Sequence, residues 1–160
     1  MDKDTRFEHG REAESRFIGY LMWNGKKARL IGQEIWLPEW VHSKFRYIND
    51  NPGVTIIRHF PDVDTGRSLV QVKAAPDCTG YDYVTIETAS FETSRELNSL
   101  GVPVLVVWEY PDKKFYGNWV NELVVNDPIT PREETNGSHT PFKKVDKSCL
   151  KPAGEFLSYL

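Results

Sequence analysis

Residues 68–75, SLVQVKAA, are the stretch of sequence that decides the fold. The run is β-branched and typical of a strand, but Gln71 and Lys73 interrupt its apolar residues. Side chains alternate between the two faces of a strand, so Gln71 and Lys73 share one face, while Val70 and Val72 share the other. A turn-rich segment precedes this run, and two further predicted strands and a helix follow it, which places it inside a sheet. A lysine inside a sheet needs a partner for its charge.

The rest of the chain predicts an α/β or α+β fold with a mixed central sheet flanked by helices. Apolar residues recur at three- and four-residue steps through residues 7–23, which predicts a helix that stops at Asn24-Gly25. The elements expected after it are a strand at 28–38, a short helix at 39–49, a strand at 54–60, the strand at 68–75, a strand at 81–89, a helix at 91–101, a strand at 102–110 and a strand or short helix at 115–125.

Two of these strands set the expected geometry of the sheet. Residues 102–110 are apolar on both faces, which is typical of a central strand that is covered on both sides. Residues 54–60 and 68–75 flank the turn PDVDTGR, so we expect them to pair as an antiparallel hairpin. If Phe60 faces Ser68 in this hairpin, Thr55 lies opposite Lys73. In the helix at 91–101 we expect Phe91, Leu97 and Leu100 to point inward.

Composition and charge limit the classes of protein. The 160 residues suit one domain at 1–125, followed by a polar, proline-containing extension at 126–160 that is wrapped or flexible rather than part of the core. No apolar run is long enough to cross a membrane. The N-terminus is charged where a secretory signal would be apolar, so we expect a cytoplasmic protein. A net charge of −3 argues against nonspecific coating of nucleic acid but permits a local basic patch.

The order of these elements resembles the core of the PD-(D/E)xK, or restriction-endonuclease-like, nuclease superfamily. In that superfamily a carboxylate on the first helix joins an aspartate and a (D/E/Q)xK tripeptide on adjacent strands. The tripeptide here would be Gln71-Val72-Lys73, and Glu14, Leu21 and Gly25 fall on the steps of the first-helix pattern. Residues 70–120 are also similar to small nuclease-like domains in which a QVK strand is followed by an apolar PVLLV strand.

The resemblance implies a DNA endonuclease that hydrolyses phosphodiester bonds with Mg²⁺ or Mn²⁺. Such a cation, held by oxygen ligands, polarises the phosphate and lowers the pKa of an attacking water. The implied ligands are Glu14, the amide oxygen of Gln71, and one further acid. Lys73 would orient the water or neutralise charge that develops on the phosphate. Because a glutamine adds no charge, such a site depends more heavily on its remaining acids.

The further acid has two candidates. The resemblance places an aspartate on the strand that pairs with residues 71–73, yet the expected register puts Thr55 there, and residues 54–60 contain no acid. Asp50 precedes that strand, and Asp62 follows Pro61 in the hairpin turn, where Pro-Asp is also a common turn sequence. A second register, Pro76-Asp77 with Glu87-Thr88-Ala89, ranks lower because it lacks the lysine; in it Glu87 would be an accessory acid.

Two further expectations concern partners. Lys26, Lys27 and Arg29 form a basic trio that either contacts DNA phosphates or only keeps a turn soluble. The competing class of function is a catalytically inactive protein of the same fold, for example a binding, accessory or structural assembly factor, including one encoded by a virus. In an assembly protein, residues 126–160 would support a homo-oligomer.

Overall fold

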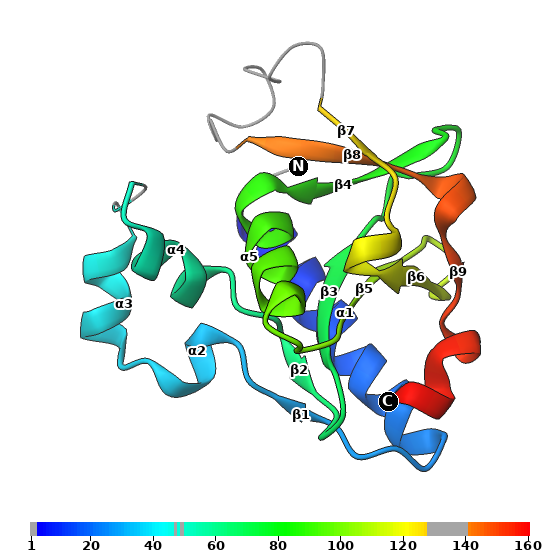
Figure 1. Cartoon of the computed structure of the whole chain (residues 1–160), viewed down its shortest axis with the longest axis horizontal. Coiled ribbons are helices and arrows are strands. Elements are labelled where there is room, and N and C mark those ends of the chain that lie inside the picture. Colours follow the sequence, from blue (N-terminus) through cyan, green and yellow to red (C-terminus); the bar gives the residue numbers. More distant parts are fainter. Residues whose placement is uncertain (1–2, 47, 49, 128–140) are drawn as a thin grey trace.

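The computed structural model describes residues 3–46, 48, 50–127 and 141–160 (Figure 1). The elements in chain order are α1 (Lys3–Trp23), β1 (Arg29–Leu30), α2 (Gln33–Trp36), α3 (Glu39–Phe45), α4 (Pro52–Arg58), β2 (Val63–Asp64), β3 (Leu69–Ala74), β4 (Tyr83–Glu87), α5 (Thr88–Ser99), β5 (Val104–Glu109), β6 (Phe115–Trp119), η1 (Val120–Glu122), β7 (Val125–Asn126), β8 (Phe142–Asp146), η2 (Lys147–Cys149), β9 (Lys151–Pro152) and η3 (Ala153–Tyr159). Among the described residues, no helix is long and apolar enough to cross a membrane.

The strands form a six-stranded mixed sheet, in the order β1-β2-β3-β5-β6-β9, and a three-stranded sheet, in the order β4-β8-β7. Strand β3 runs parallel to β5, with Gln71 beside Val106 and Lys73 beside Trp108. A parallel pair needs a crossover connection, and β4 and α5 supply it. The predicted mixed sheet with flanking helices is therefore confirmed.

Helices α1 and α5 cover opposite faces of the large sheet (Figure 1). Val70 and Val72 of β3 are buried with Phe17 and Leu21 of α1, in one hydrophobic cluster. A second cluster on the other face combines Phe91 of α5 with alternate residues of β5, ending at Trp108. Every residue of β5 is buried, which confirms the predicted central strand. Because side chains alternate along β3, Gln71 and Lys73 point to the α5 side.

Helix α1 ends where the sequence predicted. Gly25 adopts a left-handed backbone with φ of 73°, and its N–H bonds to the carbonyl of Met22 at 3.0 Å. The next N–H, of Lys26, bonds to the carbonyl of Leu21 at 2.9 Å. This pair of bonds is a Schellman motif, which satisfies carbonyls that the helix leaves open at its end.

Two predicted strands are wrong, and one of them changes the site. Of residues 28–38 only Arg29–Leu30 is a strand. Residues 54–60 lie largely in helix α4 rather than in a strand, since Asn51 caps the helix by accepting from the Val54 N–H at 3.1 Å and Pro52 occupies its first turn. The helix cap at Asn51 therefore outweighs the β-branched composition of residues 54–60. As a result, Thr55 does not lie opposite Lys73. Strand β2 pairs with β3 instead, with Val63 beside Val70.

The C-terminal residues also differ from expectation. Residues 128–140 lie outside the described part of the chain, but residues 141–160 are not a coreless extension. Val145 of β8 is buried in the α5-side cluster, and Phe156 and Leu160 are buried in the α1-side cluster. Leu100, which we expected to point inward, is 72% exposed at the end of α5. Strand β4 forms as predicted, but it pairs with β8 rather than with the large sheet.

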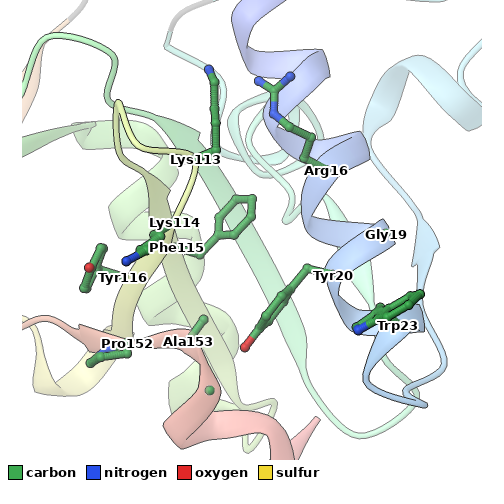
Figure 2. Close-up of a pocket in the computed structure, with 11 residues that line it drawn as sticks. Arg16, Gly19, Tyr20, Trp23, Lys113, Lys114, Phe115, Tyr116, Pro152 and Ala153 are labelled. Atoms are coloured by element: carbon green, nitrogen blue, oxygen red, sulfur yellow. The ribbon is translucent and has the colours of Figure 1, made fainter.

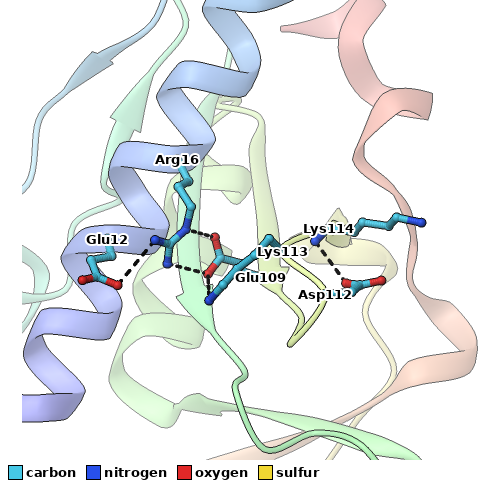
Figure 3. Close-up of polar contacts among 6 residues, drawn as sticks. All are labelled: Glu12, Arg16, Glu109, Asp112, Lys113 and Lys114. Atoms are coloured by element: carbon cyan, nitrogen blue, oxygen red, sulfur yellow. Dashed lines mark hydrogen bonds and ion pairs between the residues drawn. The ribbon is translucent and has the colours of Figure 1, made fainter.

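A buried ion pair fixes α1 against the sheet (Figure 3). Glu109, at the end of β5, is 4% exposed and accepts from Arg16 Nε at 2.6 Å and from Arg16 Nη2 at 2.8 Å. Lys113 Nζ lies 3.6 Å from the same carboxylate. A bidentate contact between an arginine and a carboxylate restricts both the distance and the relative orientation of the two groups. The Arg16–Glu109 contact therefore restricts the orientation of α1 against the sheet.

Removing the arginine tests this role. We expect Arg16→Met to lower the free energy of unfolding by about 3 kcal/mol, because Glu109 is left buried beside one distant lysine. Urea denaturation followed by circular dichroism measures the change. Glu12→Gln is the matched control, since Glu12 is 58% exposed and contacts the same arginine at 3.4 Å; its effect should stay within about 0.5 kcal/mol. Equal effects of the two substitutions would contradict the role assigned to Glu109.

Candidate active site

Asp62 is held against β3 by three hydrogen bonds. Its backbone N–H donates to the carbonyl of Val70 at 3.0 Å. Its Oδ2 accepts from the backbone N–H of Val72 at 2.7 Å and from Gln71 Nε2 at 3.1 Å. Strand β2 pairs with β3 over only two residues, so Val72 lies beyond the paired part of β3. The Asp62 carboxylate accepts the Val72 N–H, which would bond to a backbone carbonyl if β2 were longer.

Gln71 presents a buried oxygen that is unsatisfied. The residue is 3% exposed. A carboxylate only accepts hydrogen bonds, so the amide nitrogen must face Asp62 and Oε1 must face away. In the described part of the chain, Oε1 has no hydrogen-bond partner. Leaving a buried oxygen without a hydrogen-bond donor costs free energy of folding. A bound cation would remove this cost if Gln71 Oε1 were one of its ligands.

Lys73 is buried on the same face as Gln71, with a side chain that is 18% exposed. Its Nζ lies 2.8 Å from Glu87 Oε2 and 3.4 Å from Ser90 Oγ. Burial by itself lowers the pKa of Lys73, but the charges of Glu87, Asp62 and Glu14 outweigh burial and raise it. The expected partner of the buried lysine is therefore present, and Lys73 stays positively charged.

Two residues that sequence reasoning left aside complete the surroundings of Lys73. Ser90, in the first turn of α5, is 2% exposed and donates to Glu87 Oε2 at 3.4 Å. His59, at the end of α4, places Nδ1 3.1 Å from Ser90 Oγ. Burial lowers the pKa of His59, which favours the neutral imidazole. The contact between Ser90 and Glu87 had one signal in the sequence: the two residues are three positions apart at the start of a helix.

Four of the predicted site residues come together. The charges of Glu14 on α1 and of Asp62 before β2 both act on Lys73, beside Gln71. Asp50 is exposed and precedes α4, a helix about 10 Å long at 1.5 Å per residue that separates it from Asp62 along the chain. Asp77, from the lower-ranked register, is also exposed.

The basic trio lies elsewhere on the chain path. Lys26 and Lys27 follow the end of α1, and Arg29 begins β1. Arg29 Nε donates to Asp64 Oδ2 at 2.8 Å. Part of the positive charge of this trio is therefore already paired. That the trio contacts DNA stays a prediction.

The donor set fits a divalent cation only when the amide is counted. Among the described residues, no group of three or more His, Cys, Asp and Glu side chains could hold a metal ion. A cation at this position would need the carboxylates of Glu14 and Asp62, which the sequence predicted as ligands, with Gln71 Oε1 as the third oxygen. Oxygen ligands of these kinds suit Mg²⁺ and Mn²⁺.

Comparison with known proteins establishes the fold class as restriction-endonuclease-like. One solved structure to which this chain is similar is that of Hjc from Archaeoglobus fulgidus, a Holliday junction resolvase from an archaeal hyperthermophile. The similarity covers 94% of this chain and 97% of Hjc, with a TM-score of 0.52 and 12% sequence identity. No family model and no curated protein matches the sequence. At this identity, the likeness to Hjc shows the fold alone.

The Lys73–Glu87 pair gives a pH-dependent prediction. The charge of Lys73 lowers the pKa of Glu87 from 4.5 to about 2. We expect Glu87→Gln to destabilise the protein by about 1 kcal/mol at pH 7. Lys73, whose side chain is 18% exposed, loses its closest partner, but the Glu87 side chain is 44% exposed and solvent screens part of the pairing. A carboxylate with a lowered pKa stabilises the fold above pH 4.5, and this contribution is lost as the pH falls towards about 2. The difference from wild type should therefore shrink over that interval, as measured by urea denaturation.

Glu92→Gln is the matched control for this pair. Glu92 lies on α5, which begins directly after Glu87; its side chain is 51% exposed and pairs with Arg95 at 3.7 Å. Its effect should stay below about 0.5 kcal/mol at every pH. A Glu87→Gln protein as stable as wild type at pH 7 would contradict the importance of the ion pair.

Proposed function

We propose that this protein is a metal-dependent DNA endonuclease whose site consists of Glu14, Asp62, Gln71 and Lys73. The observation that carries the proposal is the bonded pair of Asp62 and Gln71, with an unsatisfied amide oxygen, beside a buried lysine that keeps its charge. The hydrogen bond between Asp62 and Gln71 supports the assignment of Pro61-Asp62 and Gln71-Val72-Lys73 to the PD and (D/E/Q)xK pattern.

Glu14, Asp62 and Gln71 would hold Mg²⁺ or Mn²⁺. When bound, the ion polarises a phosphate and supplies a nucleophilic water near neutral pH. The chain prepares this arrangement, because the Val72 N–H and the Gln71 amide nitrogen orient the Asp62 carboxylate before any ligand binds. The neutral amide lets Asp62 and residue 71 sit together without repulsion.

Lys73 would act on the phosphate. Glu87 and Ser90 fix the position of its ammonium, and the surrounding carboxylates keep it protonated. A fixed positive charge stabilises negative charge that develops on a phosphate during hydrolysis. His59 would support this position through Ser90, so it is a positioning residue rather than a catalytic one.

DNA is the phosphodiester substrate that the comparisons favour. The similar structure, Hjc, is a Holliday junction resolvase, and the sequence resembles a nuclease superfamily. Lys26, Lys27 and Arg29 are proposed to contact DNA phosphates. A cytoplasmic location and self-association stay predictions.

The competing function is a DNA-binding or assembly protein of the same fold that does not hydrolyse its ligand. The observation that favours it is the amide at Gln71, which leaves the site with one carboxylate fewer than an acid would provide. Binding of metal or DNA without cleavage would support this alternative.

Cleavage assays separate the two functions. We expect the purified protein to cut plasmid or linear DNA in Mg²⁺ or Mn²⁺, and EDTA to abolish cutting. Lys73→Met and Asp62→Asn should each reduce the rate by about 100-fold or more. Lys44→Met is the control, because Lys44 is exposed on α3. Cutting that persists in Lys73→Met, or DNA binding with no cutting in either metal, would overturn the proposed reaction.

The metal site can also be tested without activity. We expect Gln71→Glu to lower the thermal midpoint in EDTA, because a second buried carboxylate would face Asp62. Mn²⁺ should restore that midpoint and produce a larger shift than in wild type, whereas Asp62→Asn should reduce the shift. Differential scanning fluorimetry measures all three. Equal Mn²⁺ shifts in wild type, Gln71→Glu and Asp62→Asn would place the metal elsewhere.

A further inference from the structure

A pocket of about 610 Å³ lies on the α1 side of the sheet, away from the face that carries Gln71 and Lys73. It is bounded by α1, by the turn from β5 to β6, and by the start of η3 (Figure 2). Pockets of this size accommodate ligands as large as a nucleotide. The site described above does not use it.

The walls of the pocket are aromatic. Tyr20 and Phe115 have ring centroids 6.0 Å apart, and Tyr116 lines the side that β6 forms. Trp23, at the end of α1, also lines the pocket, and the residue is 91% exposed. An indole left open to solvent beside two further rings offers faces on which a planar ring can stack.

The α1 side of the pocket is kept open by a glycine. Gly19 lies inside α1, where glycine costs about 1 kcal/mol relative to alanine. Its φ is not positive, and a Cβ built on it would meet no atom within 4 Å in the described part of the chain. Neither backbone conformation nor packing therefore requires glycine, and a side chain there would project into open space.

One end of the pocket is positively charged. The lining residues include Arg16, Lys113 and Lys114, and in the described part of the chain none of the residues that line it is acidic. Figure 2 shows Arg16 and Lys113 at the same end of the pocket. The acid that pairs with them, Glu109, is 4% exposed and sits behind this surface (Figure 3). A ligand in the pocket therefore meets cations whose charge is partly balanced, because Glu109 pairs with Arg16 and Lys113 and Glu12 contacts Arg16 at 3.4 Å.

We propose that this pocket binds an unpaired nucleotide of a DNA strand, with the base against Tyr20 and Trp23 and its two flanking phosphates at Lys113 and Lys114. Phe115, which is 8% exposed, forms the floor of the pocket, and the two lysine side chains point in different directions (Figure 2). Stacking on aromatic rings beside basic residues is how proteins hold single-stranded nucleic acid. In a duplex the base is already stacked and paired, so the pocket discriminates in favour of unpaired strands. The choice of DNA rests on the proposed function.

The pocket is connected with the end of β3. Arg16 and Lys113 also line a smaller, polar pocket of about 70 Å³, and Ala74 lines that pocket too. Ala74 directly follows Lys73 in the chain. Glu12 and Glu109 also line the smaller pocket, and Ala74 points to the opposite face of β3 from Lys73, so the large pocket adjoins the end of β3 on the face away from Lys73.

The test measures binding in EDTA, so that no cleavage occurs. The probe is a fluorescein-labelled ten-nucleotide oligothymidylate, and the comparison is a labelled duplex of the same length, both followed by anisotropy. We expect Gly19→Leu, which fills the pocket, to weaken single-strand binding at least 10-fold and duplex binding less than 2-fold. Gly10→Leu is the matched control, since Gly10 is also in α1 with open space at its Cβ but does not line the pocket; it should bind like wild type.

A second variant tests the phosphate contact. Lys113→Asn combined with Lys114→Ala should weaken single-strand binding by a similar factor; asparagine is chosen because residue 113 has φ of 64°, which asparagine accepts. Circular dichroism and thermal midpoints verify that each variant is folded. Unchanged single-strand binding in both folded variants would overturn the proposal, and tighter binding of oligouridylate than of oligothymidylate would overturn the assignment to DNA.

The outcome is separable from that of the nuclease proposal. If the protein cuts DNA but Gly19→Leu binds single strands like wild type, the pocket proposal fails and the proposed reaction stands. If the protein never cuts DNA but Gly19→Leu loses single-strand binding, the pocket proposal stands and the proposed reaction fails.

Discussion

The constraint on which this structure depends is the burial of one positive charge in the middle of a sheet. Lys73 cannot leave water without partners, and the partners come from separate elements: Glu87 ends β4, Asp62 precedes β2, and Glu14 lies on α1. Alternation along β3 sends Val70 and Val72 into the core under α1 and leaves Gln71 and Lys73 on the other face. The same strand therefore builds the core and the candidate site.

Asp62 owes its position to the shortness of β2. Because that strand pairs over two residues, the Val72 N–H is accepted by a carboxylate instead of a backbone carbonyl. Gln71 suits this arrangement, since its amide nitrogen donates to Asp62, whereas a glutamate could not donate when ionised. With glutamine at position 71, the candidate site is stable without a cation. It offers a cation one negative charge fewer than a site with glutamate there.

Helix α1 serves both faces of the molecule. The charge of Glu14 acts on Lys73, while Arg16, Gly19 and Tyr20 border the aromatic pocket. The bond from Arg16 to the buried Glu109 holds the helix in one rotation about its axis. The orientation of α1 thus links the proposed reaction to the proposed strand-binding pocket.

The sequence by itself determined the first helix and its stop at Gly25, the alternation at residues 68–75 and the buried strand near 104–109, because these are local patterns of spacing and turn chemistry. It also singled out Glu14, Gln71 and Lys73. Only the tertiary structure showed that Asp62 bonds to Gln71 and to the Val72 N–H, that Ser90 and His59 lie beside the lysine, and that Phe156 belongs to the core. These outcomes depend on bonds and packing between segments far apart in the chain, which local spacing does not encode, and a helix cap at Asn51 outweighed the β-branched run that followed it.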